Sequence, residues 1–66
     1  MSVSVGGNIK KMRLERDMTQ GELADKVSVT ISMISQIERG IKVPTILLAN
    51  DIAKVFGCKT DDFFKD

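Results

Sequence analysis

The side chains of this chain that could do chemistry favour recognition over catalysis. The chain has no His and a single Cys, Cys58, among its 66 residues. Without His it lacks the commonest general base. One thiol without imidazoles can neither supply the four ligands of a structural zinc site nor form a disulfide within the chain. What remains are hydroxyls, amides and cations, which bind partners by hydrogen bonds and charge. We therefore expect no catalytic residue, no metal site and no cofactor.

Length and composition limit the architecture as well. Sixty-six residues give room for one domain, spanning 1–66, and for no separate sensor domain, so no small-molecule effector is expected. The hydrophobic fraction of 42% and charged fraction of 29% are near globular averages. No apolar run approaches the roughly 18 residues of a membrane span, and the N-terminal residues do not resemble a signal peptide. We expect a cytoplasmic protein with no membrane partner. The net charge of +1 does not by itself indicate nucleic acid.

Apolar residues recur at helical spacing along almost the whole chain, which predicts an all-α fold. The only alternating stretch, residues 2–5, is too short to seed a sheet. Hydroxyl residues and glycines mark where helices begin and end: Thr19 with Glu22 in a capping-box pattern, Thr30 and Thr45, then Gly40 and Gly57. We expect a compact five-helix bundle, with helices from Gly7 or Asn8 to Arg16, then over about 19–27, 30–39 and 45–56, and a short one from Thr60.

The last predicted helix rests on Thr60 as its cap. Asp61 and Asp62 would stand in its first turn, where acids suit the positive end of the helix dipole. Phe63 and Phe64 would then plug a core that is otherwise aliphatic.

Two predicted helices, those that begin at Thr19 and Thr30, lie about three residues apart and form a candidate helix-turn-helix. In that motif the second helix enters the major groove of DNA. The pattern alone shows two adjacent short helices, which also occur in proteins that bind no nucleic acid. Charge placement adds faint support, because residues 1–42 hold seven basic and five acidic side chains and residues 43–66 hold three and four.

The residue types in this region resemble the Cro/repressor (Xre-type) helix-turn-helix family of phage and bacterial transcription regulators. The resemblance covers roughly residues 6–64 and is carried by motifs in register: TQGELA at 19–24, VT at 29–30, ISQIERG at 34–40, PT at 44–45, IA at 52–53 and FF at 63–64. It implies a lambda-repressor-like DNA-binding domain whose helix-turn-helix is formed by the second and third helices. It also implies double-stranded DNA as the partner.

The resemblance places base contacts at outward positions near the start of the third helix, occupied by Ile31, Ser32, Met33 and Gln36. The Gln36 amide can bond an adenine edge in a bidentate manner, and Ser32 can donate or accept. Ile31 and Met33 can pack on thymine methyl groups, but they depart from the polar types usual at these positions. Ile31 could simply be exposed, and Met33 could pack in the core or against a partner.

The resemblance also assigns contacts to the phosphate backbone. Gln20 matches a glutamine that clamps a phosphate and braces the recognition helix, and Arg39 and Lys42 match a loop that lies along the backbone. Lys10 and Arg16 are weaker candidates for the same role. Such contacts are blind to sequence and strongly dependent on salt. For each cation the alternative is a solvated surface charge.

Two further positions concern how the recognition helix is held. Glu38 is out of place near phosphates, and the resemblance pairs it with Arg13 in a partly buried structural ion pair. Ser28 stands where the family commonly carries a Gly with positive φ, so it would bear modest strain if that conformation is kept.

The predicted helix over 45–56 carries more apolar residues than one face needs. Ile46, Leu47 and Val55 lie off the main stripe and predict a homodimer interface that extends to Cys58 and Lys59. Two copies on a two-fold axis would place the recognition helices about 34 Å apart, one turn of B-DNA. Alternatively, Ile46 only staples the start of the helix and Val55 is a lone surface residue.

These observations predict a sequence-specific transcriptional regulator of the repressor type. It would bind a pseudo-palindromic operator as a homodimer, with its third helix in the major groove, and block or recruit RNA polymerase. The alternative is a protein-interaction module of the same fold, an antitoxin-like or antirepressor-type partner, with Ile31, Met33, Leu47 and Val55 as its apolar surface.

Overall fold

A computed structural model describes residues 4–65, and over this range the chain is all-α. Residues 2 and 3 of the alternating stretch lie outside the described range. The described chain has four α-helices and one 3-10 helix: α1 (Val5–Glu15), α2 (Gln20–Lys26), α3 (Ile31–Glu38), α4 (Ile46–Phe56) and η1 (Thr60–Phe64). The all-α class is confirmed. The expectation of five α-helices is wrong for the last, which is a single 3-10 segment.

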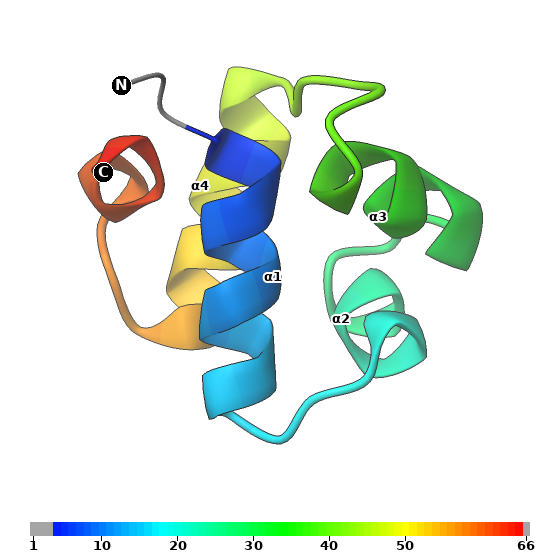
Figure 1. The fold of residues 1–66 in the computed structure, drawn as a ribbon. Coiled ribbons are helices and arrows are strands. Elements are labelled where there is room, and N and C mark those ends of the chain that lie inside the picture. Colours follow the sequence, from blue (N-terminus) through cyan, green and yellow to red (C-terminus); the bar gives the residue numbers. More distant parts are fainter. Residues whose placement is uncertain (1–3, 66) are drawn as a thin grey trace.

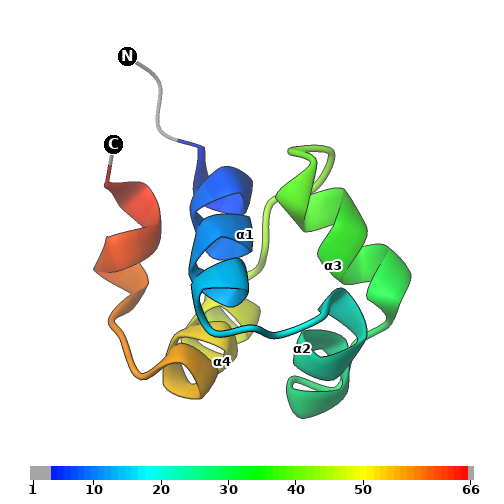
Figure 2. The ribbon, with the colours of Figure 1, turned by 60° about the horizontal axis from the view of Figure 1, so that its bottom comes forward.

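The helices are arranged in three groups around α1. Figure 1 shows α1 in front of α4, with η1 on one side and the α2–α3 pair on the other. The second view separates α2 and α3, which pack against each other, from η1 on the opposite side of α1 (Figure 2). The helix-turn-helix therefore stands at one flank of the molecule, supported from behind by α1 and α4.

The core lies where these helices meet. Its largest fully buried side chains come from every element: Ile9, Leu23, Ile34, Ile37, Ile52 and Phe63. Phe56 and Phe63 pack edge to face with ring centroids 6.2 Å apart. Phe64, expected to fill the core, is 57% exposed. Adjacent residues of a helix point in different directions, so only Phe63 faces inward.

A side-chain hydroxyl caps the N-terminus of each of the four α-helices. The capping box of Thr19 and Glu22 is confirmed, as are the caps from Thr30 and Thr45. The start of α1 is earlier than expected, because the Ser4 hydroxyl accepts a hydrogen bond from the Gly7 N–H at 3.0 Å. Thr60 does not cap η1; Lys59 is the N-cap residue, and its N–H donates to Asp62 Oδ2 at 3.1 Å.

One glycine is needed for α1 and α3 to approach. A Cβ at Gly6 would lie 1.9 Å from the Ile37 carbonyl oxygen, inside van der Waals contact. Any larger residue would push α1 away from α3. The position of α3 therefore depends on a residue in the first turn of α1.

Residues 4–65 lack two features that would have pointed to other functions. None of the helices there is long and apolar enough to cross a membrane. The same residues contain no group of three His, Cys, Asp or Glu side chains placed to hold a metal ion.

Candidate nucleic-acid interface

The turn between α2 and α3 sets the direction of α3. Ser28 keeps the left-handed conformation, with φ of 58°. Its neighbour Val29 donates its N–H to the Ala24 carbonyl at 3.0 Å, which closes the end of α2. Asp17, between α1 and α2, also has positive φ, at 52°, which sequence reasoning missed because Asp gives a weaker signal for this conformation than Gly.

The inner face of α3 fixes which side chains point outward. Ile34 and Ile37 are 1% exposed and anchor the helix on the core. Ile31 and Ser32 are exposed, and Gln36 is half-buried. Met33 is half-buried and packs against the core, as its alternative interpretation described. The outer face of α3 is therefore presented by Ile31, Ser32 and Gln36.

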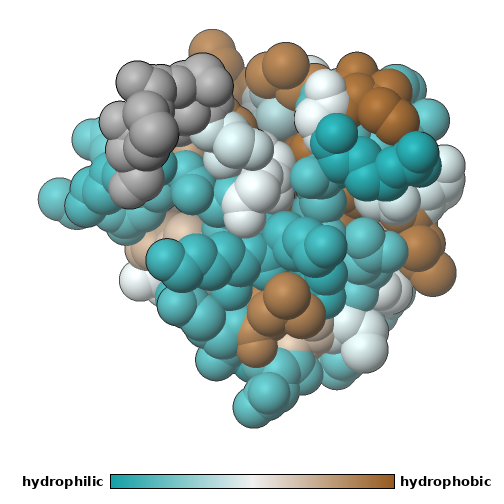
Figure 3. All heavy atoms as spheres, viewed as in Figure 1, coloured by the Kyte–Doolittle hydropathy of each residue, from teal (hydrophilic) through white to brown (hydrophobic). Residues whose placement is uncertain are grey.

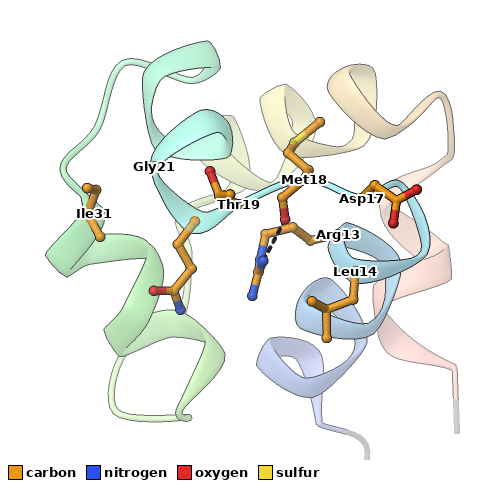
Figure 4. A pocket seen from close by; sticks show the side chains of 8 residues that line it. Arg13, Leu14, Asp17, Met18, Thr19, Gly21 and Ile31 are labelled. Atoms are coloured by element: carbon orange, nitrogen blue, oxygen red, sulfur yellow. Dashed lines mark hydrogen bonds between the residues drawn. The ribbon is translucent and has the colours of Figure 1, made fainter.

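The structure brings Arg13 and Glu38 together in a buried bidentate ion pair. Arg13 Nε donates to Glu38 Oε2 at 2.7 Å and Arg13 Nη2 to Glu38 Oε1 at 3.0 Å, and the two side chains are 7% and 2% exposed. The hydrogen bonds that Arg13 donates to Glu38 raise the pKa of Arg13 above its usual value. The third donor, Nη1, bonds the Met18 carbonyl at 2.6 Å, the dashed line in Figure 4. One guanidinium thus joins α1, the α1–α2 turn and the end of α3.

Gln20 completes this network. Its Nε2 donates to Glu38 Oε1 at 3.0 Å, a link between α2 and α3 that the spacing of the residues did not specify. Gln20 also lines an open hollow of about 610 Å³ between α1 and the starts of α2 and α3. Figure 4 shows Ile31 on one side of this hollow and Leu14 on the other. Gln20 therefore braces α3 through Glu38, which is one of the two roles expected of it.

The candidate phosphate-binding cations divide into two groups. Lys10, Arg39 and Lys42 are exposed, and Arg39 caps the end of α3. Arg16 has contacts that the sequence did not predict. Its Nε and Nη2 donate to the Phe56 carbonyl at 3.1 and 2.9 Å, and its guanidinium lies 4.9 Å from the centroid of the Phe56 ring.

These contacts give Arg16 a structural role beside the expected one. Its Nη1 also donates to the Met12 carbonyl, at 2.8 Å. A cation bound to the last carbonyls of α4 neutralises the negative end of that helix. Arg16 ties α1 to α4, and its role as a phosphate ligand stays a prediction.

Exposed apolar side chains gather where α4 begins. Ile46 and Leu47, expected in a dimer interface, are 82% and 77% exposed. Two residues that sequence reasoning missed join them: Val43, 84% exposed, and Phe64. The exposure of Val43 could have been suspected from the sequence, because it is an apolar residue in a loop immediately before Pro44. Figure 3 shows hydrophobic surface at this end of the molecule.

The same patch contains a hollow of about 130 Å³, to which Val43, Ile46 and Phe64 contribute. The C-terminal part of the expected interface differs, because Val55 and Cys58 are half-buried and pack against the core. Burial raises the pKa of the Cys58 thiol. Lys59 is exposed. The apolar patch therefore lies at the start of α4, not at its end.

Known proteins resemble this chain in both sequence and fold. A family model described as helix-turn-helix (HTH_3) matches residues 9–63. An HTH-type transcriptional regulator of Archaeoglobus fulgidus is 43% identical over 56 residues, which are 85% of this chain and 79% of that protein.

Two solved structures were bound to DNA. SinR, a master regulator for biofilm formation crystallised with DNA, is 29% identical, with a TM-score of 0.86 over 92% of this chain and 98% of its own. The P22 c2 repressor in complex with a synthetic operator is 28% identical, with a TM-score of 0.86 over 92% of each chain.

Proposed function

This chain belongs to the helix-turn-helix (HTH_3, Xre/Cro-type) family of DNA-binding transcriptional regulators, and we propose that it binds a pseudo-palindromic operator as a homodimer with α3 in the major groove. Like its relatives, which are HTH-type transcriptional regulators, it is a regulator and not an enzyme. The observation that carries the proposal is the outer face of α3, where Ile31, Ser32 and Gln36 stand outward on a helix that the Arg13–Glu38–Gln20 network fixes.

Base readout would come from this face. The Gln36 amide can bond both polar atoms of an adenine edge, and Ser32 can donate or accept. Ile31 is 57% exposed and offers its methyl groups to a thymine. Met33, which packs on the core, would contribute less than the other three, at the edge of the contact.

Backbone contacts would flank α3. Arg39 at the end of α3 and Lys42 in the following loop are exposed cations, and Lys10 on α1 is a third. Gln20 keeps one side-chain amide N–H that can donate to a phosphate oxygen while the other braces Glu38. These contacts add affinity without sequence preference.

The apolar patch at the start of α4 supports the homodimer. Val43, Ile46 and Phe64 line one hollow there, and Leu47 follows Ile46 in the first turn of α4. Each of these four side chains exposes more than half of its surface. A patch of this kind is typical of an association surface, and a two-fold pair places two recognition helices for two half-sites. The dimer would act in the compartment that holds the DNA, which we expect to be the cytoplasm, by blocking or recruiting RNA polymerase.

Selection of bound fragments from random DNA duplexes tests the proposal. We expect an inverted repeat. Gln36→Ala should relax one position of each half-site at a cost of about 1–3 kcal/mol, whereas Arg39→Ala should weaken all sequences alike and reduce the salt dependence. Lys54→Ala, at an exposed position of α4, is the matched control and should change neither.

Sedimentation tests the dimer separately. Leu47→Asp should give a folded monomer with weakened operator binding, because a charge on the apolar patch opposes association. A folded protein that shows no duplex binding at low salt would refute the operator proposal and favour the protein-interaction module instead.

A further inference from the structure

We define the outer face of α1 as Gly7, Lys10, Lys11 and Leu14, and of these residues the proposed DNA contacts use only Lys10. Leu14, near the C-terminal end of α1, is 54% exposed, whereas the other residues of this face are lysines and a glycine. In the view of Figure 3, hydrophobic protrusions stand out from the hydrophilic surface that covers most of this side of the molecule.

Leu14 is shared by two hollows. One is the 610 Å³ hollow that extends to Gln20 and Ile31. The other, of about 480 Å³, is lined by Gly7, Lys10, Lys11, Leu14 and Glu15. The outer face of α1 therefore forms the floor of one shallow recess, and Leu14 separates this recess from the other hollow.

The chemistry of this face matches one kind of occupant. Lys10 and Lys11 place two exposed cations about one helical turn from Leu14. A phosphate backbone could use the cations but gains nothing from an exposed leucine, whereas an amphipathic helix with carboxylates and an apolar anchor uses both. Glu15 and Asp17 follow Leu14, so carboxylates of a partner would lie toward Lys10 and Lys11 and away from the end of α1.

We propose that the outer face of α1 docks an acidic amphipathic helix of a regulatory protein, and that this docking excludes DNA. The exclusion rests on the proposed function. The hollow on one side of Leu14 is walled by Ile31 and Gln20, so a helix anchored on Leu14 and lying across that hollow covers one base-reading residue and one phosphate-binding residue. Such a partner controls operator occupancy without altering the fold.

A displayed library of random 16-residue helical peptides, selected against the full chain without DNA, tests this proposal. We expect the enriched peptides to carry Asp or Glu together with an apolar residue one turn away. The binding of the best peptide, measured by fluorescence anisotropy, should weaken about tenfold or more in Leu14→Gln and also in Lys10→Gln/Lys11→Gln. Leu47→Gln, which removes an even more exposed leucine from the other apolar patch, should leave peptide binding unchanged.

Peptide binding without DNA and displacement of a bound duplex are separate readouts. Peptides that bind Leu14→Gln as tightly as the unmodified chain, or that depend on Leu47, would overturn the docking site. A loss of duplex binding in Leu14→Gln, with the fold intact by circular dichroism, would assign this face to DNA and overturn the docking site too.

Peptide binding to the outer face of α1 without displacement of the duplex would overturn the exclusion alone. A chain that binds these peptides but no duplex would contradict the proposed function and leave the docking site standing.

Discussion

Replacement of Glu38 by Ala should unfold the domain before it changes DNA specificity. The substitution removes the acceptor of two Arg13 hydrogen bonds and of the Gln20 bond, and leaves the Arg13 guanidinium, 7% exposed, without a counter-charge. Removing one partner of a buried pair costs about 3–5 kcal/mol. A domain of 66 residues has only about 3–10 kcal/mol of total stability, so the loss takes a large part of it.

Thermal and urea unfolding, followed by circular dichroism, measure this cost. At about 4–8 °C per kcal/mol for a domain of this size, the melting temperature of Glu38→Ala should fall by at least roughly 12 °C. The double variant Arg13→Met/Glu38→Leu is the control. It removes both charges together and should recover most of the loss, since apolar pairs often replace buried ion pairs at little cost. A Glu38→Ala variant within about 1 kcal/mol of the unmodified chain would refute the reasoning.

Three further substitutions test the local structure. Gly6→Ala should destabilise the domain by about 1–3 kcal/mol or more, because its Cβ would clash with the Ile37 carbonyl. Gly21→Ala should be tolerated, because its Cβ would meet no atom nearer than Ile31 Cδ1 at 3.4 Å, and equal urea midpoints for the two variants would contradict this reasoning. Ser28→Gly should stabilise the fold by about 0.5–1 kcal/mol by relieving a left-handed conformation, and a lower melting temperature would argue against strain there. The Thr19 backbone N–H holds the pKa of Glu22 below its usual value, so the contribution of this carboxylate to stability is complete above the unfolded-state pKa near 4.3 and is lost as pH falls through the lower native value. Glu22→Gln should therefore flatten the dependence of stability on pH between about 5 and 3, and an unchanged profile would show that the capping box does not titrate.

Local signals were enough to predict much of the fold. Thr19, Thr30 and Thr45 cap helices because a hydroxyl three residues before an orphan N–H satisfies it wherever the helix lies. Gly40 and Gly57 take positive φ for an equally local reason. The α-helical class and the outward face of α3 follow from the spacing of apolar residues.

Sequence reasoning failed or was incomplete where contacts between distant residues determine the burial and the partners of a side chain. Phe64 reads as core in sequence, but η1 turns only Phe63 toward α1 and α4. Arg16 is the exposed cation that the sequence predicts, but its bonds to the Phe56 carbonyl could not be predicted because the end of α4 is distant in sequence. The exposure of Val43 likewise depends on how the loop before α4 runs over the core.

The amino-acid sequence by itself determined the caps, the helix-turn-helix and the residue types on its outer face, because these depend on interactions within a few residues of the chain. Only the tertiary structure decided that Gln20 shares Glu38 with Arg13, that Arg16 binds the end of α4, and that apolar surface gathers at Val43, Ile46, Leu47 and Phe64. Those features join residues distant in sequence, and helix packing alone determines which of them meet.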